Sequence, residues 1–202
     1  EYLPAVSAGI ALVDGDTTGA EQLLTNAQAA SEQAREPRSC ERFTPVPLAR
    51  SRRRLAIETA LRRAVAAGEL HLVYQPRVAS DTLEITGVEC LLRWEHAQLG
   101  PVGPDEFVPI AEETGLIDQI GDWVLDEACR QVATWRIRFE DDFFVSVNIA
   151  ARQLRQPNFA TRIKATLDKH RLPAEALELE ISESSVVHAP QEARRMLEAL
   201  RR

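Results

Sequence analysis

From residue 70 onward, short segments typical of β-strands alternate with longer segments that have the apolar spacing of amphipathic helices. Such alternation is typical of α/β proteins in which helices connect the parallel strands of one sheet. We therefore predict an α/β fold with a parallel sheet and helical crossovers. The predicted strands are Leu70–Pro76, Glu84–Trp94, Phe143–Ala150 and Ala176–Ser182.

The helices expected between and after these strands have recognisable ends. Proline at the first helical position and acidic residues in the first turn mark one start, and glycine marks its end. The expected helices are one from Pro104 to Gly115, one from Ile117 to Trp135, one over Asn158–His170 and one that starts near Pro190.

The predicted strands share a polar face. In a strand, alternate side chains point to opposite faces, so Asn148 lies opposite Val147, and Glu180 lies opposite Leu179. Gln75, Glu89 and Arg93 take similar positions in the first two strands. We expect these polar groups near the carboxyl ends of the strands, where α/β folds place ligands and chemistry. For any one strand, a polar face turned to water is the alternative.

Buried carboxylates need a partner, and a hard cation is the natural one for Glu89, Asn148 and Glu180. Ligands that are all oxygen suit Mg²⁺ or Mn²⁺ and argue against zinc or copper. The three cysteines form no C-x-x-C pair, so we expect free thiols in a reducing cytoplasm.

Charge and hydropathy exclude other classes of protein. The 202 residues carry a net charge of −7, which argues against binding to DNA. The basic residues between Arg50 and Arg63 are therefore expected to form a solvated or interdomain surface. No apolar run approaches the ~18 residues of a membrane helix, and the acidic first residues lead us to expect no signal peptide in this segment.

The first 50 residues form a separate part. We predict a short strand at Val6–Val13, a helix at Ala20–Arg35 and a proline-bracketed linker at 37–50. A further helix is expected to run from Ser51, as its N-cap, to Gly68. The chain begins with Glu1 and ends in helix-like sequence, so we expect a segment of a longer protein.

Five motifs follow one another between residues 70 and 200: Y-Q-P at 74–76, G-V-E-C-L-L-R-W at 87–94, G-P-D-E-F-V-P-I-A-E-E-T-G-L-I at 103–117, S-V-N at 146–148 and E-I-S-E at 180–183. In this order they resemble the EAL domain, the cyclic-di-GMP phosphodiesterase module. This resemblance implies a TIM-like (β/α)₈ barrel, of which about the first half is expected here.

The resemblance also implies roles by position. Glu89, Asn148 and Glu180 resemble metal ligands, and the two glutamates would be catalytic through the metal. Gln75 and Arg93 resemble the residues that hold the dinucleotide, with Arg93 on a phosphate. Two further positions complete the comparison: Glu183 resembles a loop-stabilising glutamate, and Cys90 replaces the usual alanine but should point away from the metal.

The N-terminal part more faintly resembles the last strand and helix of a GGDEF domain. We therefore divide the chain into a GGDEF-like remnant at 1–36, a linker at 37–50 and an EAL-like domain at 51–202. The family's paired aspartates and catalytic lysine would follow Arg202.

The implied reaction is metal-dependent hydrolysis of c-di-GMP to linear pGpG in bacterial signalling. Glu89 and Glu180 together balance only one divalent ion, and two-metal hydrolysis needs two, so we expect this chain to be inactive alone. The alternatives are a silent c-di-GMP-binding or regulatory module and an inert truncated remnant. A half-barrel would also expose Val73 and Leu91, which predicts a homodimer through the open side or an unstable monomer.

Overall fold

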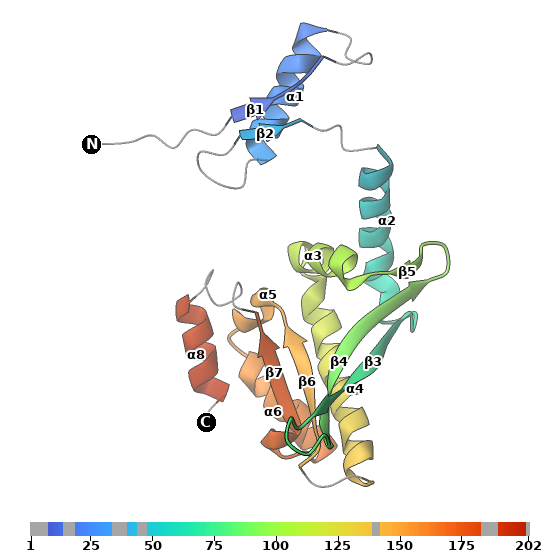
Figure 1. Ribbon diagram of the computed structural model, residues 1–202, viewed down its shortest axis with the longest axis vertical. Helices are drawn as coiled ribbons and strands as arrows, with labels where there is room; N and C mark the ends of the chain where they lie inside the picture. The colour runs from blue at the N-terminus through green and yellow to red at the C-terminus, as the bar shows by residue number, and fades with distance from the viewer. Residues whose placement is uncertain are drawn as a thin grey trace, which may run out of the picture. The chain divides into compact units, whose positions relative to one another are not determined.

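The computed structural model describes residues 8–13, 19–33, 40–43, 48–138, 142–182 and 190–200, and its elements are labelled in Figure 1. The chain forms two compact units, Glu1–Arg53 and Arg54–Arg202, which we describe separately. Within the described residues, no helix is both long enough and apolar enough to cross a membrane.

The first unit is a small βαβ arrangement. Strand β1 (Ala8–Ile10) pairs in parallel with β2 (Cys40–Arg42), and helix α1 (Ala20–Gln33) lies between them in the chain. A Cβ at Gly9 would lie 1.9 Å from the Ala27 carbonyl oxygen, so glycine permits the close approach of α1. The expected strand and helix are present, and β2 falls inside the segment predicted to be a linker.

Helix α2 (Leu48–Ala64) begins before the expected N-cap, so Ser51 lies inside the helix. The chain then turns through Gly68, whose φ of 68° belongs to the left-handed region that glycine adopts without strain. The apolar face of α2 is buried at Ile57 and Leu61, as its spacing indicates.

The sheet of the second unit has the strand order β3-β4-β6-β7, and β5 pairs with β4. The pairs β4–β6 and β6–β7 are parallel, whereas β3–β4 and β4–β5 are antiparallel. The path does not close on itself within the described residues. The strands are β3 (Leu70–Val78), β4 (Ile85–His96), β5 (Gly100–Val102), β6 (Phe144–Ile149) and β7 (Leu177–Ile181).

The antiparallel start of the sheet corrects the prediction of parallel strands throughout. A parallel connection needs a crossover of a dozen or more residues. Residues 79–84 are too few for one, so β3 and β4 form a hairpin. The chain direction of β3 is therefore opposite to that of β4, β6 and β7, and its carboxyl end lies beside their amino-terminal halves.

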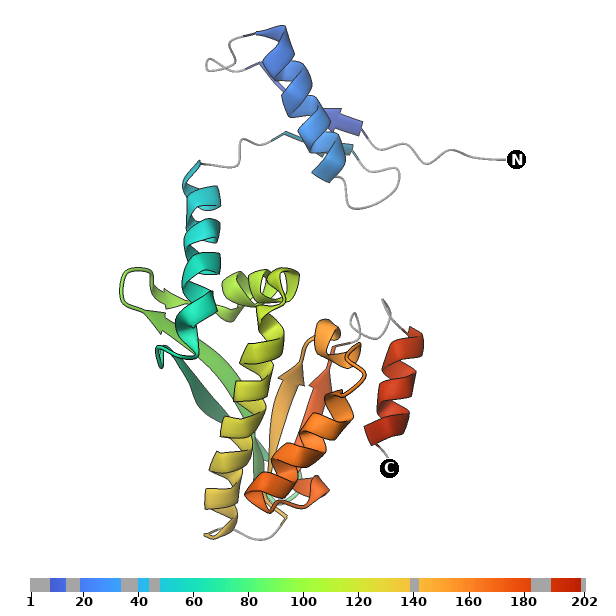
Figure 2. The same ribbon diagram turned by 180° about the vertical axis from the view of Figure 1, so that it is seen from behind.

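Helices α4 and α6 cover one face of the sheet, as Figure 2 shows from behind. Their apolar sides pack against the side chains that alternate strand residues turn inward, including Val88, Val145 and Val147. The helices of this unit after α2 are α3 (Pro104–Thr114), α4 (Leu116–Arg136), α5 (Ala151–Leu154), α6 (Phe159–His170), the 3₁₀ helix η1 (Ala174–Ala176) and α8 (Pro190–Leu200).

The boundary between α3 and α4 is at Gly115, as the sequence predicts. Its φ is 79°, and its amide donates a hydrogen bond to the Glu112 carbonyl, which ends α3 in a left-handed cap. This cap lets the chain turn directly into α4, the longest helix on the buried face of the sheet.

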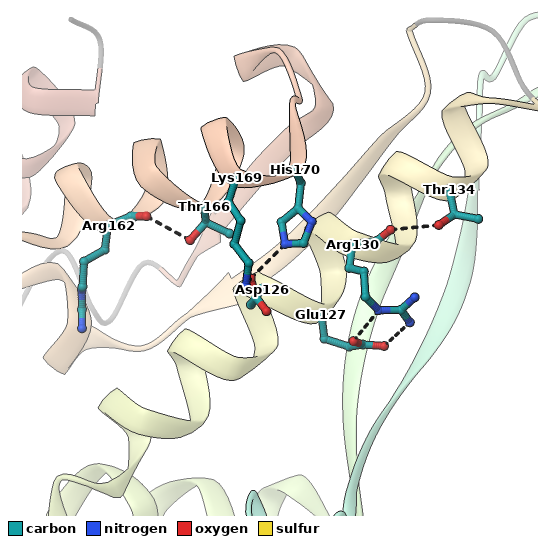
Figure 3. A network of polar contacts seen from close by, with 8 residues as sticks. All are labelled: Asp126, Glu127, Arg130, Thr134, Arg162, Thr166, Lys169 and His170. Atoms are coloured by element: carbon teal, nitrogen blue, oxygen red, sulfur yellow. Dashed lines mark hydrogen bonds and ion pairs between the residues drawn. The ribbon is translucent and has the colours of Figure 1, made fainter.

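Polar contacts join the carboxyl end of α6 to the middle of α4 (Figure 3). Asp126 on α4 accepts hydrogen bonds from Lys169 Nζ at 2.6 Å and from His170 Nε2 at 2.9 Å. Nearer the start of α6, Arg162 pairs with Asp122 at 2.9 Å. These contacts hold α6 against α4 where the helix packing reaches solvent.

Candidate functional site

The predicted polar face lies opposite the helices, because the intervening strand residues form the core. Cys90 and Val147, the neighbours of Glu89 and Asn148, are buried at 3% and 2% exposure. The cross-strand register places Gln75, Glu89, Ser146 and Glu178 in one row across the four strands. Asn148 and Glu180 pair with each other two residues further along β6 and β7.

Three of the predicted site residues are thus brought together, although Glu89 and Glu180 lie 91 positions apart in the chain. Asn148 Nδ2 donates a hydrogen bond to Glu89 Oε1 at 2.9 Å, and Glu180 is the register partner of Asn148. This bond turns the Asn148 amide nitrogen toward Glu89 and leaves its oxygen free of that contact.

The donor set fits a hard divalent cation. The candidate ligands are two carboxylates and one amide oxygen, with no nitrogen or sulfur donor, which is the chemistry that Mg²⁺ and Mn²⁺ prefer. Within the described residues, no group of three or more His, Cys, Asp or Glu side chains gathers as a metal centre.

Sequence reasoning missed Arg77, whose side chain reaches over this face from the edge strand β3. Its Nη1 donates to Glu180 Oε1 at 3.1 Å and to Ser146 Oγ at 3.3 Å, and it also pairs with Glu178. The hydrogen bond to Glu178 raises the pKa of the guanidinium. The two-residue period of a strand could have identified it, because Arg77 lies two residues after Gln75 and therefore on the same face of β3.

The two residues predicted to bind the dinucleotide lie on neighbouring strands, Gln75 on β3 and Arg93 on β4. Gln75 is exposed directly opposite Glu89. Arg93 is four residues beyond Glu89, roughly 13 Å along an extended strand, and its Nη1 donates to the Leu92 carbonyl at 2.9 Å. The structure places Gln75 beside Glu89 and does not bring Arg93 to it.

A pocket of about 300 Å³ opens near Arg93. Strands β4 and β6 pair only from Gly87 to Cys90, and beyond that point they separate. The residues past the separation line the two sides of the pocket, and α3 and α4 contribute its mostly apolar floor. Its polar lining groups include Arg93, Asn148, Glu112 and Ser182.

Two further predictions concern Cys90 and Glu183. Cys90 points into the core, as its parity predicts, and burial raises the pKa of its thiol to about 12. The Cys90 side chain is thus buried on the opposite face of β4 from Glu89. All three cysteines are free. Glu183 lies outside the described residues.

The sequence profile of the EAL domain matches residues 58–202. The Pseudomonas aeruginosa protein MucR, a bifunctional diguanylate cyclase/cyclic di-GMP phosphodiesterase, is 39% identical over 185 residues, which are 91% of this chain and 27% of MucR. The cyclic di-GMP phosphodiesterase NbdA of the same bacterium is 34% identical over 200 residues, 96% of this chain and 25% of NbdA. The chain thus spans about a quarter of the length of these curated relatives.

Solved structures share the fold. The PaMucR phosphodiesterase in complex with c-di-GMP superposes with a TM-score of 0.69 and 40% identity, over 72% of this chain and 59% of that one. The FimX EAL domain from Pseudomonas aeruginosa, bound to c-di-GMP, gives a TM-score of 0.62 and 27% identity, over 73% of this chain and 57% of that one. The expected α/β fold of the EAL type is confirmed by this likeness.

Proposed function

The chain belongs to the EAL domain family, and from this premise we propose that residues 58–202 carry the first part of a c-di-GMP phosphodiesterase site. In the proposed reaction, a water oxygen bonds to phosphorus while one bond from phosphorus to a ribose oxygen breaks. The cyclic dinucleotide opens to linear pGpG. The observation that carries the proposal is the placement of Glu89, Asn148 and Glu180 on adjacent strands of one face.

We assign Glu89, Asn148 and Glu180 to one Mg²⁺ or Mn²⁺ ion. A bound divalent ion supplies the activated water. Glu89 and Glu180 are catalytic in this proposal because their carboxylates hold the ion. Glu183 keeps the loop-stabilising role that its motif implies.

We assign Gln75 and Arg93 to the dinucleotide. Arg93 reaches a phosphate through charge-assisted hydrogen bonds, and Gln75 contacts the substrate beside Glu89. The pocket of about 300 Å³ next to Arg93 supports the assignment of Arg93, because it is at the lower end of the size range of small-molecule sites.

We expect the 202-residue chain to bind one ion and to turn over no substrate alone. Hydrolysis by two metals needs ions about 3.5–4 Å apart with bridging ligands. The two carboxylates assigned here contribute a charge of −2, which balances one divalent ion. A silent c-di-GMP-binding or regulatory module is the second candidate, and it is favoured by Arg77, which already neutralises part of this face.

The remaining parts of the proposal concern the rest of the chain. Residues 1–36 form the GGDEF-like remnant and 51–202 the EAL-like domain, in a cytoplasmic protein, whereas the predicted linker at 37–50 holds strand β2 and the start of α2. The likeness to the bifunctional MucR supports this division, because it extends over 185 residues and so beyond the EAL match. A homodimer would cover the open sheet face, where Val73 is 37% exposed.

The proposal can be tested by measuring metal binding and nucleotide binding separately. Calorimetry should show c-di-GMP binding to the 202-residue chain and Mn²⁺ binding in a separate titration. Glu89→Gln should lose Mn²⁺ binding and keep c-di-GMP binding, whereas Arg93→Ala should show the reverse. Chromatography should detect no pGpG with either ion.

Loss of both ligands in both variants, with folding intact, would contradict the division of roles. Metal-dependent pGpG formation that vanishes in Glu89→Gln would contradict the expected inactivity and support the phosphodiesterase itself.

A further inference from the structure

Arg77 crosses the sheet to reach its partners. It lies on the edge strand β3, opposite Gly87 on β4, and Gly87 in turn pairs with Phe144 on β6. The guanidinium carbon lies 5.5 Å from the centroid of the Phe144 ring, a cation–π distance. The side chain therefore runs over β4 and β6 before it meets Glu178 and Glu180 on β7.

Gly87 and Phe144 together make this path. A Cβ at Gly87 would lie 2.7 Å from the Phe144 carbonyl oxygen and 2.8 Å from its ring, so no other residue fits without a shift. The missing side chain leaves room for the ring, and the ring supports the guanidinium. Ser146, which is fully buried, gives Arg77 a fixed acceptor beside the ring.

The same guanidinium binds a carboxylate that the proposed function assigns to a metal ion. Arg77 Nη1 lies 3.1 Å from Glu180 Oε1, within normal hydrogen-bond distance. The charge of Glu89 also favours the charged form of Arg77, after the larger effects of Glu178 and Glu180 that raise the pKa of this guanidinium. Without the arginine, the three acidic groups on this face (Glu89, Glu178 and Glu180) would carry a formal charge of −3, and with it they carry −2.

We propose that Arg77 is a built-in counter-ion that competes with the divalent cation for Glu180 and sets the threshold for metal binding. The inference rests on the proposed function, because it takes Glu180 as a ligand. When an ion binds, Arg77 gives up Glu180 and stays anchored to Glu178 and Ser146. Arg77 is a positioning residue in this scheme, since it acts through Glu180.

The test is a titration with Mn²⁺ alone, followed by electron paramagnetic resonance, on the full 202-residue chain. Arg77→Gln should bind Mn²⁺ about fivefold more tightly than the wild type, the order of effect of losing one exposed ion pair. Arg77→Met should behave alike, because it keeps an aliphatic stem over Phe144 and also removes the charge. Arg77→Lys should remain near the wild type.

Arg138→Gln is the matched control, because this exposed arginine follows α4, away from the polar face, and it should leave Mn²⁺ affinity unchanged. A purely structural role would instead lower the melting temperature and weaken Mn²⁺ binding in the neutral variants. Suppose that the wild type binds Mn²⁺ and that folded Arg77→Gln and Arg77→Met bind it equally well or more weakly. This result would overturn the inference about Arg77 and leave the proposed metal site standing. Absence of binding in the wild type and in both neutral variants would overturn the inference together with the proposed metal site.

Discussion

Gly87→Ala should destabilise the second unit and disturb the candidate site at the same time. The added Cβ would meet the Phe144 carbonyl oxygen at 2.7 Å and two atoms of its ring at 2.8 Å. Both distances are shorter than real Cβ contacts, and the oxygen belongs to the backbone of a strand that is paired on both sides. The clash therefore cannot be relieved by turning a flexible side chain.

The magnitude follows from the cost of overpacking. Inserting one methyl group into a well-packed position costs about 1–3 kcal/mol, and we expect a value near 2 kcal/mol because a backbone atom must move. For a chain of this size, that corresponds to a fall in melting temperature of about 4–8 °C. Phe144→Leu should restore part of the loss in the Gly87→Ala background, since it removes the ring contacts and leaves the carbonyl contact.

The assay is urea unfolding followed by tryptophan fluorescence, with thermal melts by circular dichroism. Gly103→Ala is the matched control, because its φ is −70° and a Cβ there would meet nothing within 4 Å. Gly103 is the N-cap of α3, where glycine is preferred to alanine, so this control should lower the unfolding free energy by about 0.5 kcal/mol, clearly less than Gly87→Ala does. Equal midpoints for Gly87→Ala and the wild type would refute the reasoning about close approach at this position.

Two further predictions concern other parts of the second unit. Asp126→Asn should lower the unfolding free energy by about 1 kcal/mol at neutral pH, the upper range for exposed ion pairs. Burial raises the pKa of Asp126, but hydrogen bonds from Lys169 and His170 outweigh this effect, so the folded-state pKa is lowered. The stability difference between the wild type and Asp126→Asn should therefore disappear as the pH falls through the folded-state pKa. A stability difference that persists in acid would contradict this origin. The 202-residue chain should sediment as a dimer or larger species, because the sheet face around Val73 is open, and a monomer with a sharp cooperative melt would sink that prediction.

The sequence alone determined which residues share a face and where the main helices lie. Strand alternation has a period of two, so Glu89, Asn148 and Glu180 could be placed together before any contact was known. Proline and glycine at the two ends of α3 marked its bounds for similarly local reasons. Such features depend on neighbours in the chain, and neighbours are what a sequence displays.

Only the tertiary structure decided the partners of Arg77 and the shape of the pocket. Arg77 and Glu178 are 101 residues apart, and their contact depends on the strand order, on the direction of β3 and on the space above Gly87. The pocket exists because β4 and β6 separate after Cys90, which no local pattern records. Pairing between distant segments is fixed by the packing of the whole sheet, so these features had to be seen in three dimensions.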